Sequence, residues 1–158
     1  QKDMSRASIQ LPVCELGICI NAILTPLTKD RKIFFKNLQR CIARNGKLIV
    51  TVPSMESYLL ARRIQNEYTI DRAVFPKLSS APKALRYWNN LLQGVCDIDA
   101  VPHKHFLAEE LELLFTKAGF TPLRLDKIEY NWTTEFNQPP RWLRSPKPWD
   151  WLLIAERN

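Results

Sequence analysis

Residues 14–55 constrain the fold most, because they place a helical pattern between two apolar runs. Residues 14–24, CELGICINAIL, contain one charge, and residues 47–52, KLIVTV, form a second run that ends in Pro-Ser. Between them, residues 30–44 repeat apolar side chains at helical spacing. A strand–helix–strand unit of this length makes a right-handed crossover and sets its two strands in parallel. We therefore predict an α/β fold in which ligands bind at the carboxyl ends of the strands.

The rest of the chain predicts more helices and an antiparallel end to the sheet. Residues 54–100 predict a helical insert, a candidate lid, with helices after Ser54 and over residues 83–93. Residues 107–118 carry a clear helical pattern, which Gly119 ends. A proline-rich loop joins strands at residues 121–130 and 149–156, so these strands are expected to pair antiparallel. Residues 101–106, VPHKHF, are predicted to form a loop.

Composition narrows the class of protein. The 158 residues are 46% hydrophobic, which suits a single domain, over residues 1–158, with a sizeable core. No apolar run approaches the ~20 residues of a membrane span, and the first residues lack a signal peptide's apolar core. The four cysteines show no C-x-x-C spacing and are interpreted as small buried hydrophobes. This usage favours a reducing, cytoplasmic location.

The order of these elements resembles the C-terminal half of a class I S-adenosylmethionine (SAM)-dependent methyltransferase. CELGICINAIL matches that family's fourth strand, and RCIARNGKLIVTVPS matches the end of a helix and the fifth strand. FLAEELELLFTKAGF matches the helix before the sixth strand, and WDWLLIAERN matches the antiparallel last strand. The resemblance implies a partial Rossmann-like sheet, with parallel strands and a C-terminal antiparallel strand. It also implies SAM as cofactor.

The family's glycine-rich cofactor loop, E/D-x-G-x-G-x-G, has no counterpart in this sequence. None of the four glycines forms a G-x-G, and no acidic residue matches the one that would bind the ribose hydroxyls. Either the sequence is part of a longer chain, the interpretation we favour, or the protein is naturally short and does not bind SAM in the usual way. The strand at residues 14–24 then has an open hydrophobic edge. A missing N-terminal segment or a second chain is expected to cover it.

The resemblance also implies cofactor-binding positions. Asp3 and Met4 match the position beside the adenine ring, while Cys19, Ile20 and Asn21 match the carboxyl end of the family's fourth strand. Family members touch the methionine part of the cofactor or the adenine edge there. The competing interpretations are a frayed terminus for the first pair, core packing for Cys19 and Ile20, and a turn for Asn21.

Aromatic residues and histidines supply candidates for the acceptor side. Tyr58, Trp88, Tyr130 and Trp132 could line an acceptor pocket, although packing of the insert on the sheet is the simpler interpretation. His103 and His105 could act at a substrate site as bases near neutral pH. No further ligands are spaced near them, so no metal site is expected.

We expect a SAM-dependent methyltransferase with a small-molecule acceptor, because the helical insert resembles an acceptor lid. One alternative is a methyltransferase-like binding or scaffold protein without activity. Another is a basic nucleic-acid-binding module, suggested by the net charge of +7. The basic residues are scattered, but one late loop interleaves them with an aromatic ring and could contact phosphates or stacked bases: Arg141, Trp142, Arg144 and Lys147. The sequence carries no signal for the acceptor's identity or the methylated atom.

Overall fold

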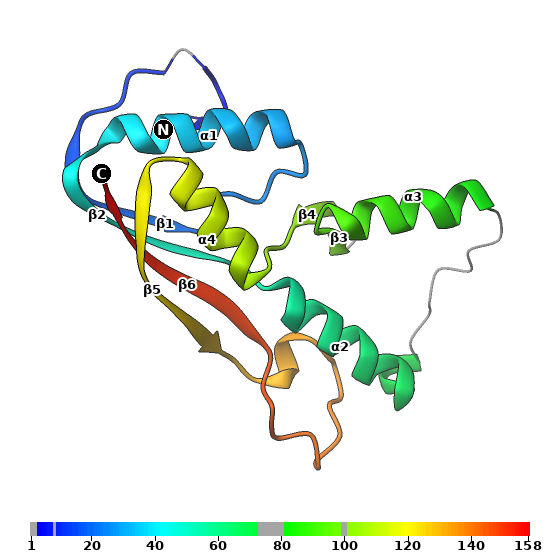
Figure 1. Ribbon diagram of the computed structural model, residues 1–158. Coiled ribbons are helices and arrows are strands. Elements are labelled where there is room, and N and C mark those ends of the chain that lie inside the picture. Colours follow the sequence, from blue (N-terminus) through cyan, green and yellow to red (C-terminus); the bar gives the residue numbers. More distant parts are fainter. Residues whose placement is uncertain (1–2, 8, 73–80, 99–100) are drawn as a thin grey trace.

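The computed structural model describes residues 3–7, 9–72, 81–98 and 101–158, which form a mixed sheet, flanking helices and a small hairpin (Figure 1). The elements in chain order are β1 (Cys14–Ile20), α1 (Thr28–Cys41), β2 (Ile42–Pro53), α2 (Met55–Glu67), η1 (Ile70–Arg72), α3 (Ala81–Leu92), β3 (Val95–Ile98), β4 (Val101–Lys104), α4 (Ala108–Lys117), β5 (Phe120–Glu129), η2 (Trp132–Thr134) and β6 (Trp149–Arg157).

The main sheet has the strand order β1-β2-β6-β5. β1 and β2 are parallel, with Ile18 opposite Ile49, because α1 carries the chain back across the sheet. β6 pairs antiparallel with both β2 and β5. The expected α/β fold with parallel strands and a C-terminal antiparallel strand is therefore confirmed.

Helices α1 and α4 cover one face of this sheet (Figure 1). Phe35 of α1 meets Phe115 of α4 edge to face, with ring centroids 5.1 Å apart. Beneath them lie fully buried side chains of β2 and β6, including Val50, Val52 and Leu153. This core holds the carboxyl ends of β1 and β2 in place.

β1 is an edge strand that pairs only with β2 among the described residues. Its side chains alternate between the two faces, so that Cys19 enters the core while Leu16, Ile18 and Ile20 point to the opposite face. These three apolar side chains are 54%, 64% and 67% exposed. The expected open hydrophobic edge is thus present.

Three local predictions were wrong. The strand predicted over residues 14–24 ends at Ile20. The helical pattern runs to residue 44, but α1 ends at Cys41 and β2 begins at Ile42. A bulge follows, with Asn45 at a φ of 60°, and a Cβ at Gly46 would meet the Glu15 carbonyl at 2.9 Å. The segment predicted as the loop VPHKHF instead forms β4 over Val101–Lys104, because β3 provides a cross-strand partner.

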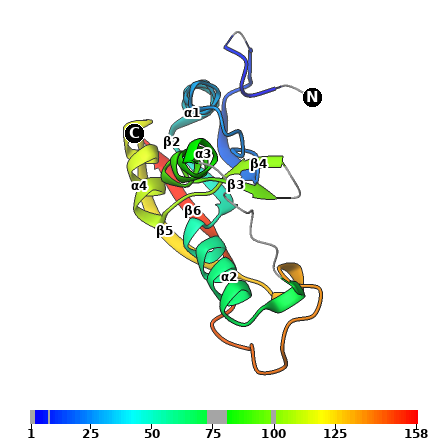
Figure 2. The same cartoon turned by 90° about the vertical axis from the view of Figure 1, so that its right-hand side faces the viewer.

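The range predicted as a helical insert contains α2 and α3. Helix α3 projects away from the main sheet in Figure 1, and Figure 2 shows α2 at the end of the sheet. The range closes with strand β3, and residues 73–80 and 99–100 of it lie outside the described part. No helix in the described ranges has the length and apolarity needed to cross a bilayer.

Candidate functional site

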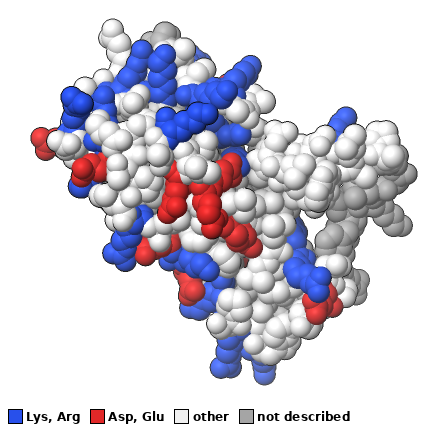
Figure 3. Space-filling view, in the orientation of Figure 1, with Lys and Arg blue, Asp and Glu red and all other residues white. Residues whose placement is uncertain are grey.

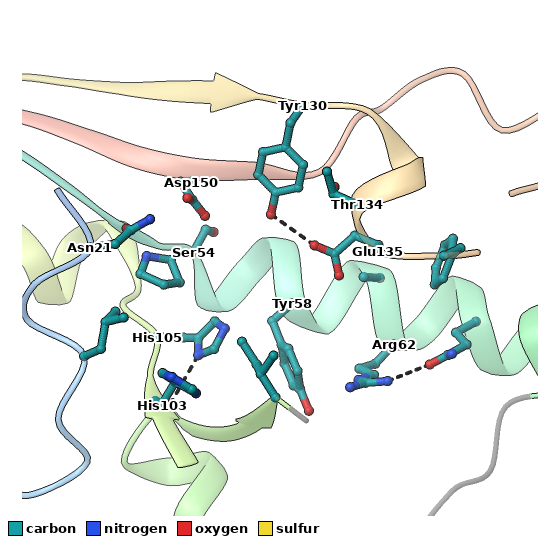
Figure 4. A pocket seen from close by; sticks show the side chains of 16 residues that line it. Asn21, Ser54, Tyr58, Arg62, His103, His105, Tyr130, Thr134, Glu135 and Asp150 are labelled. Carbon is teal, nitrogen blue, oxygen red and sulfur yellow. Dashed lines mark hydrogen bonds between the residues drawn. The ribbon is translucent and has the colours of Figure 1, made fainter. Parts of the chain in front are cut away.

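A cavity of about 520 Å³ lies where β1 and β2 end, bordered by α2, the region around β4 and the loop after β5 (Figure 4). This is the edge of an α/β sheet at which ligands bind. The polar and aromatic side chains that line the cavity include Asn21, Ser54, Tyr58, His105, Tyr130 and Asp150.

Asn21 and Ser54 mark the ends of the two parallel strands. Asn21 has a φ of 44°, which asparagine tolerates better than most residues, and its backbone N–H donates to the Thr51 carbonyl at 3.0 Å. The buried Ser54 caps α2, since its hydroxyl accepts the Ser57 amide at 3.0 Å. Helix α2 therefore begins at the cavity and brings Tyr58 to its wall.

His105 is held between β4 and α4. Its backbone amide donates to the carbonyl of Gly94 at 2.7 Å, and its ring lies 5.2 Å from that of Tyr58. The Nδ1 atom is 3.3 Å from the carbonyl oxygen of His103, to which it can donate. Burial lowers the pKa of His105 to about 4, so its imidazole is neutral at pH 7.

Two carboxylates face the cavity from the loop after β5 and from the start of β6. The Tyr130 hydroxyl donates to Oε1 of Glu135 at 3.1 Å (Figure 4). Burial raises the pKa of Asp150, although a hydrogen bond with Asn21 opposes the shift, and the charge of Glu135 adds to it. The pKa of Tyr130 is also raised, by burial first and then by these two carboxylates. The cavity thus concentrates negative charge beside aromatic rings.

The structure brings only part of the predicted acceptor set together. Tyr58, His103, His105 and Tyr130 all line the cavity. Trp88 does not, because it lies on α3 with 58% of its side chain exposed. Trp132 is buried in a second small core, stacked on Phe136 with ring centroids 5.3 Å apart.

Of the five residues predicted to bind the cofactor, only Asn21 lines this cavity. Cys19 lies in the core, and Ile20 is exposed on the other face of β1. The Asp3 carboxylate is exposed and accepts the amide and the hydroxyl of Ser5, at 2.9 and 2.7 Å. The Met4 side chain packs against the main core.

Sequence reasoning missed the two carboxylates. Asp150 reaches the cavity because the antiparallel pairing sets it opposite Pro53, at the carboxyl end of β2. The one available signal was an acidic side chain near the start of the otherwise apolar run WDWLLIAE. Glu135 carried no signal, since an acid in a polar loop is usually solvated.

The late basic loop forms a separate feature. Arg141, Arg144 and Lys147 border a second cavity of about 360 Å³. Trp142 is 57% exposed and packs edge to face on Tyr68, with centroids 4.7 Å apart. On the face shown in Figure 3, basic side chains gather over α1 and acidic ones over α4, so this face carries both signs of charge.

No protein-family model matches the sequence. No curated protein matches it either. The fold, in contrast, is similar to solved structures. A SAM-dependent methyltransferase from Methanosarcina mazei aligns with 99% of this chain at a TM-score of 0.60 and 16% identity. The PH0226 protein from Pyrococcus horikoshii aligns with 99% of this chain at a TM-score of 0.59 and 16% identity.

A third structure is magnesium protoporphyrin IX methyltransferase from Synechocystis with bound SAH (S-adenosylhomocysteine), which aligns over 99% of the chain at a TM-score of 0.50 and 11% identity. The chain spans 65%, 57% and 49% of the lengths of these three proteins. At such identities the likeness establishes the fold. The chain therefore has part of the fold of the class I SAM-dependent methyltransferases.

Proposed function

We propose that the protein is a SAM-dependent methyltransferase whose small-molecule acceptor binds in the cavity at the carboxyl ends of β1 and β2. The observation that carries this proposal is the position of the cavity, at the end of parallel strands in a methyltransferase fold. Its volume of about 520 Å³ suits a small molecule. The similar solved structures, which include a SAM-dependent methyltransferase and a methyltransferase with bound SAH, support SAM as the cofactor.

The cofactor-binding residues fit this proposal in part. Asn21 presents its amide at the cavity, and Ile20 offers an exposed apolar surface beside it. The Cys19 thiol faces the core, so this residue could contribute only its backbone. Asp3 would have to give up its hydrogen bonds with Ser5 to hold an adenine amine. Asn21 and Ile20 are therefore the residues that we propose would hold SAM, with Met4 and Asp3 nearer the adenine by resemblance.

When bound, SAM supplies a methyl group that its sulfonium has already activated, so the protein's main task is alignment. In our proposal Tyr58 and Tyr130 orient the acceptor. The neutral His105 could receive a proton from it.

Calorimetric titration of the purified protein with SAM, SAH and ATP tests the proposal. SAM and SAH are expected to bind, whereas ATP, which shares only the adenosine, is expected to bind far more weakly. Asn21→Gly keeps the positive φ but removes the amide, and loss of one hydrogen bond should weaken SAM binding about tenfold. Asn45→Gly, also at a positive φ but away from the cavity, is the matched control.

Absence of SAM binding would leave the inactive binding or scaffold protein as the better interpretation. Oligonucleotide binding that weakens with salt would favour the basic nucleic-acid-binding module instead. Equal losses of SAM affinity in Asn21→Gly and Asn45→Gly would show that Asn21 does not bind the cofactor.

We also propose that another polypeptide segment, or a second copy of the chain, covers the exposed row of Leu16 and Ile18. Light scattering after size exclusion measures this association. If a second copy covers the row, the protein is a dimer, and Ile18→Lys converts it to a monomer. A wild-type monomer unaffected by Ile18→Lys would exclude a second copy as the cover.

A further inference from the structure

The cavity at the carboxyl ends of β1 and β2 has a charge opposite to that of the protein. The whole chain carries a net charge of +7. Besides the two histidines, the charged side chains among the described residues that line the cavity are Glu135, Asp150 and Arg62, which sum to one net negative charge. No lysine is among the described residues that line it.

Arg62, the one arginine or lysine among the described residues of the lining, does not neutralise these acids. Nη1 of Arg62 donates to Oε1 of Gln65 at 2.7 Å, and its guanidinium lies 5.1 Å from the Tyr58 ring centroid. Within the described residues neither Glu135 nor Asp150 has an ion-pair partner. Burial opposes ionisation of Asp150, as its raised pKa shows, and the charge of Glu135 adds to this effect. A ligand cation beside Asp150 and Glu135 would favour the ionised form of both carboxylates.

Aromatic rings surround the same space. Tyr58, Tyr130 and Phe136 line the cavity from α2 and from the segment that follows β5 (Figure 4). Aromatic faces attract organic cations, and the attraction grows when water is excluded. Rings combined with carboxylates that lack an ion-pair partner within the described residues therefore favour a ligand with a positive charge on an apolar body.

A second, independent observation comes from His105. Its side chain is 96% buried yet lines the cavity, since only 4% of the residue is exposed. With Nδ1 donating to the His103 carbonyl, Nε2 of a neutral imidazole is an acceptor, and no described residue donates to it. This acceptor suits a ligand that brings an N–H donor.

We propose that the cavity binds a small organic amine in its protonated form, held by Asp150 and Glu135, enclosed by Tyr58 and Tyr130, and donating a hydrogen bond to His105. For the methyl acceptor, this inference rests on the proposed function, since it makes the acceptor an amine, whose nitrogen must release its proton before it can take the methyl group. Amine binding itself requires no cofactor and can be measured separately.

Three probes of matched size test the proposal by calorimetry on the purified protein: phenethylamine, the neutral 2-phenylethanol and the anionic 3-phenylpropionate. Phenethylamine should bind at least about tenfold more tightly than the alcohol, because only the cation gains the carboxylate and aromatic contacts. The carboxylate probe should show no binding. Equal binding of amine and alcohol, or tighter binding of the carboxylate, would overturn the proposal.

Variants then locate the effect. Asp150→Asn and Glu135→Gln should each reduce phenethylamine affinity about tenfold and leave the affinity for 2-phenylethanol unchanged. Glu112→Gln removes one negative charge from an exposed position on α4, outside the cavity, and should have no effect. Glu135 is also exposed, so its variant is expected to fold even if Asp150→Asn does not. Unchanged amine affinity in folded Glu135→Gln and Asp150→Asn would refute the assignment.

The two proposals fail in different ways. Amine binding without SAM binding would refute the methyltransferase function and keep the amine site. SAM binding without any amine preference would keep the function and refute the amine acceptor.

Discussion

Acidification should destabilise this protein through His105, because the folded state buries the ring. The pKa of His105 falls from an ordinary value of 6.5 to about 4, chiefly through burial, with smaller contributions from the charges of His103, Lys104 and Arg62. Between these two pH values the unfolded chain binds a proton that the folded chain does not. The free energy of unfolding therefore falls as the pH drops through 6.5, and it levels off below about pH 4.

The size of the effect follows from the shift. At about 1.4 kcal/mol per pH unit, a change from 6.5 to about 4 corresponds to a loss of about 3 kcal/mol between pH 7.5 and pH 4. Urea unfolding followed by the fluorescence of the five tryptophans measures this loss. His105→Asn keeps a donor for the His103 carbonyl but removes the titrating ring. Between pH 7.5 and pH 4, the free energy of unfolding of this variant should therefore fall by about 3 kcal/mol less than that of the wild type.

The comparison of wild type and variant is essential, because other groups titrate in this range. The raised pKa of Asp150 acts in the opposite direction, since the folded state then binds a proton more readily as the pH falls. His103→Asn leaves His105 buried and should keep the steep profile. Parallel pH profiles for wild type and His105→Asn would refute the reasoning.

Three further substitutions probe packing and buried charge. Phe115→Ala should lower the free energy of unfolding in urea by about 3–5 kcal/mol, because Phe115 is fully buried. Leu113→Ala, on the exposed side of the same helix, should lower it by under about 0.5 kcal/mol. Similar losses in the two variants would contradict the packing. Ser54→Ala should cost about 1 kcal/mol through the lost helix cap, and an unchanged urea midpoint would argue against the cap. The Lys104 side chain is 1% exposed, and its Nζ lies 2.6 Å from Oε1 of Glu110. Glu110→Gln leaves this buried ammonium without its counter-charge, so we expect the free energy of unfolding to fall by about 3 kcal/mol. The double variant Lys104→Met/Glu110→Gln should recover most of that loss, and failure to do so would contradict the buried-pair argument.

Much of the fold could be predicted because its signals are local. The apolar periodicity of residues 107–118 placed α4 within one residue at either end, and the run at residues 149–156 placed β6 equally well. The strand–helix–strand unit implied parallel pairing of β1 and β2, which the structure confirms. Each inference needed only the spacing of apolar residues and one general rule for connections.

The local errors arose where partners distant in sequence decide the structure. Val101–Lys104 looked like a loop because histidine and proline interrupt its apolar pattern, yet pairing with β3 makes it a strand. The bulge at Asn45 and Gly46 depends on the register between β1 and β2, since Cys14 pairs with Ile42 but Leu16 pairs with Lys47. Neither register nor cross-strand partner is visible in a short window of sequence.

By itself, the sequence determined the order of the main-sheet strands and their helices along the chain, the buried faces of these helices and the end of the sheet at which a ligand would bind. Only the tertiary structure decided which side chains meet there. Asp150 reaches the cavity through the register of β6 on β2, and His105 through the hairpin of β3 and β4. Apolar periodicity acts over a few residues, whereas a cavity joins side chains from Asn21 to Asp150. Strand order and register, which are properties of the folded chain, therefore set the chemistry of the site.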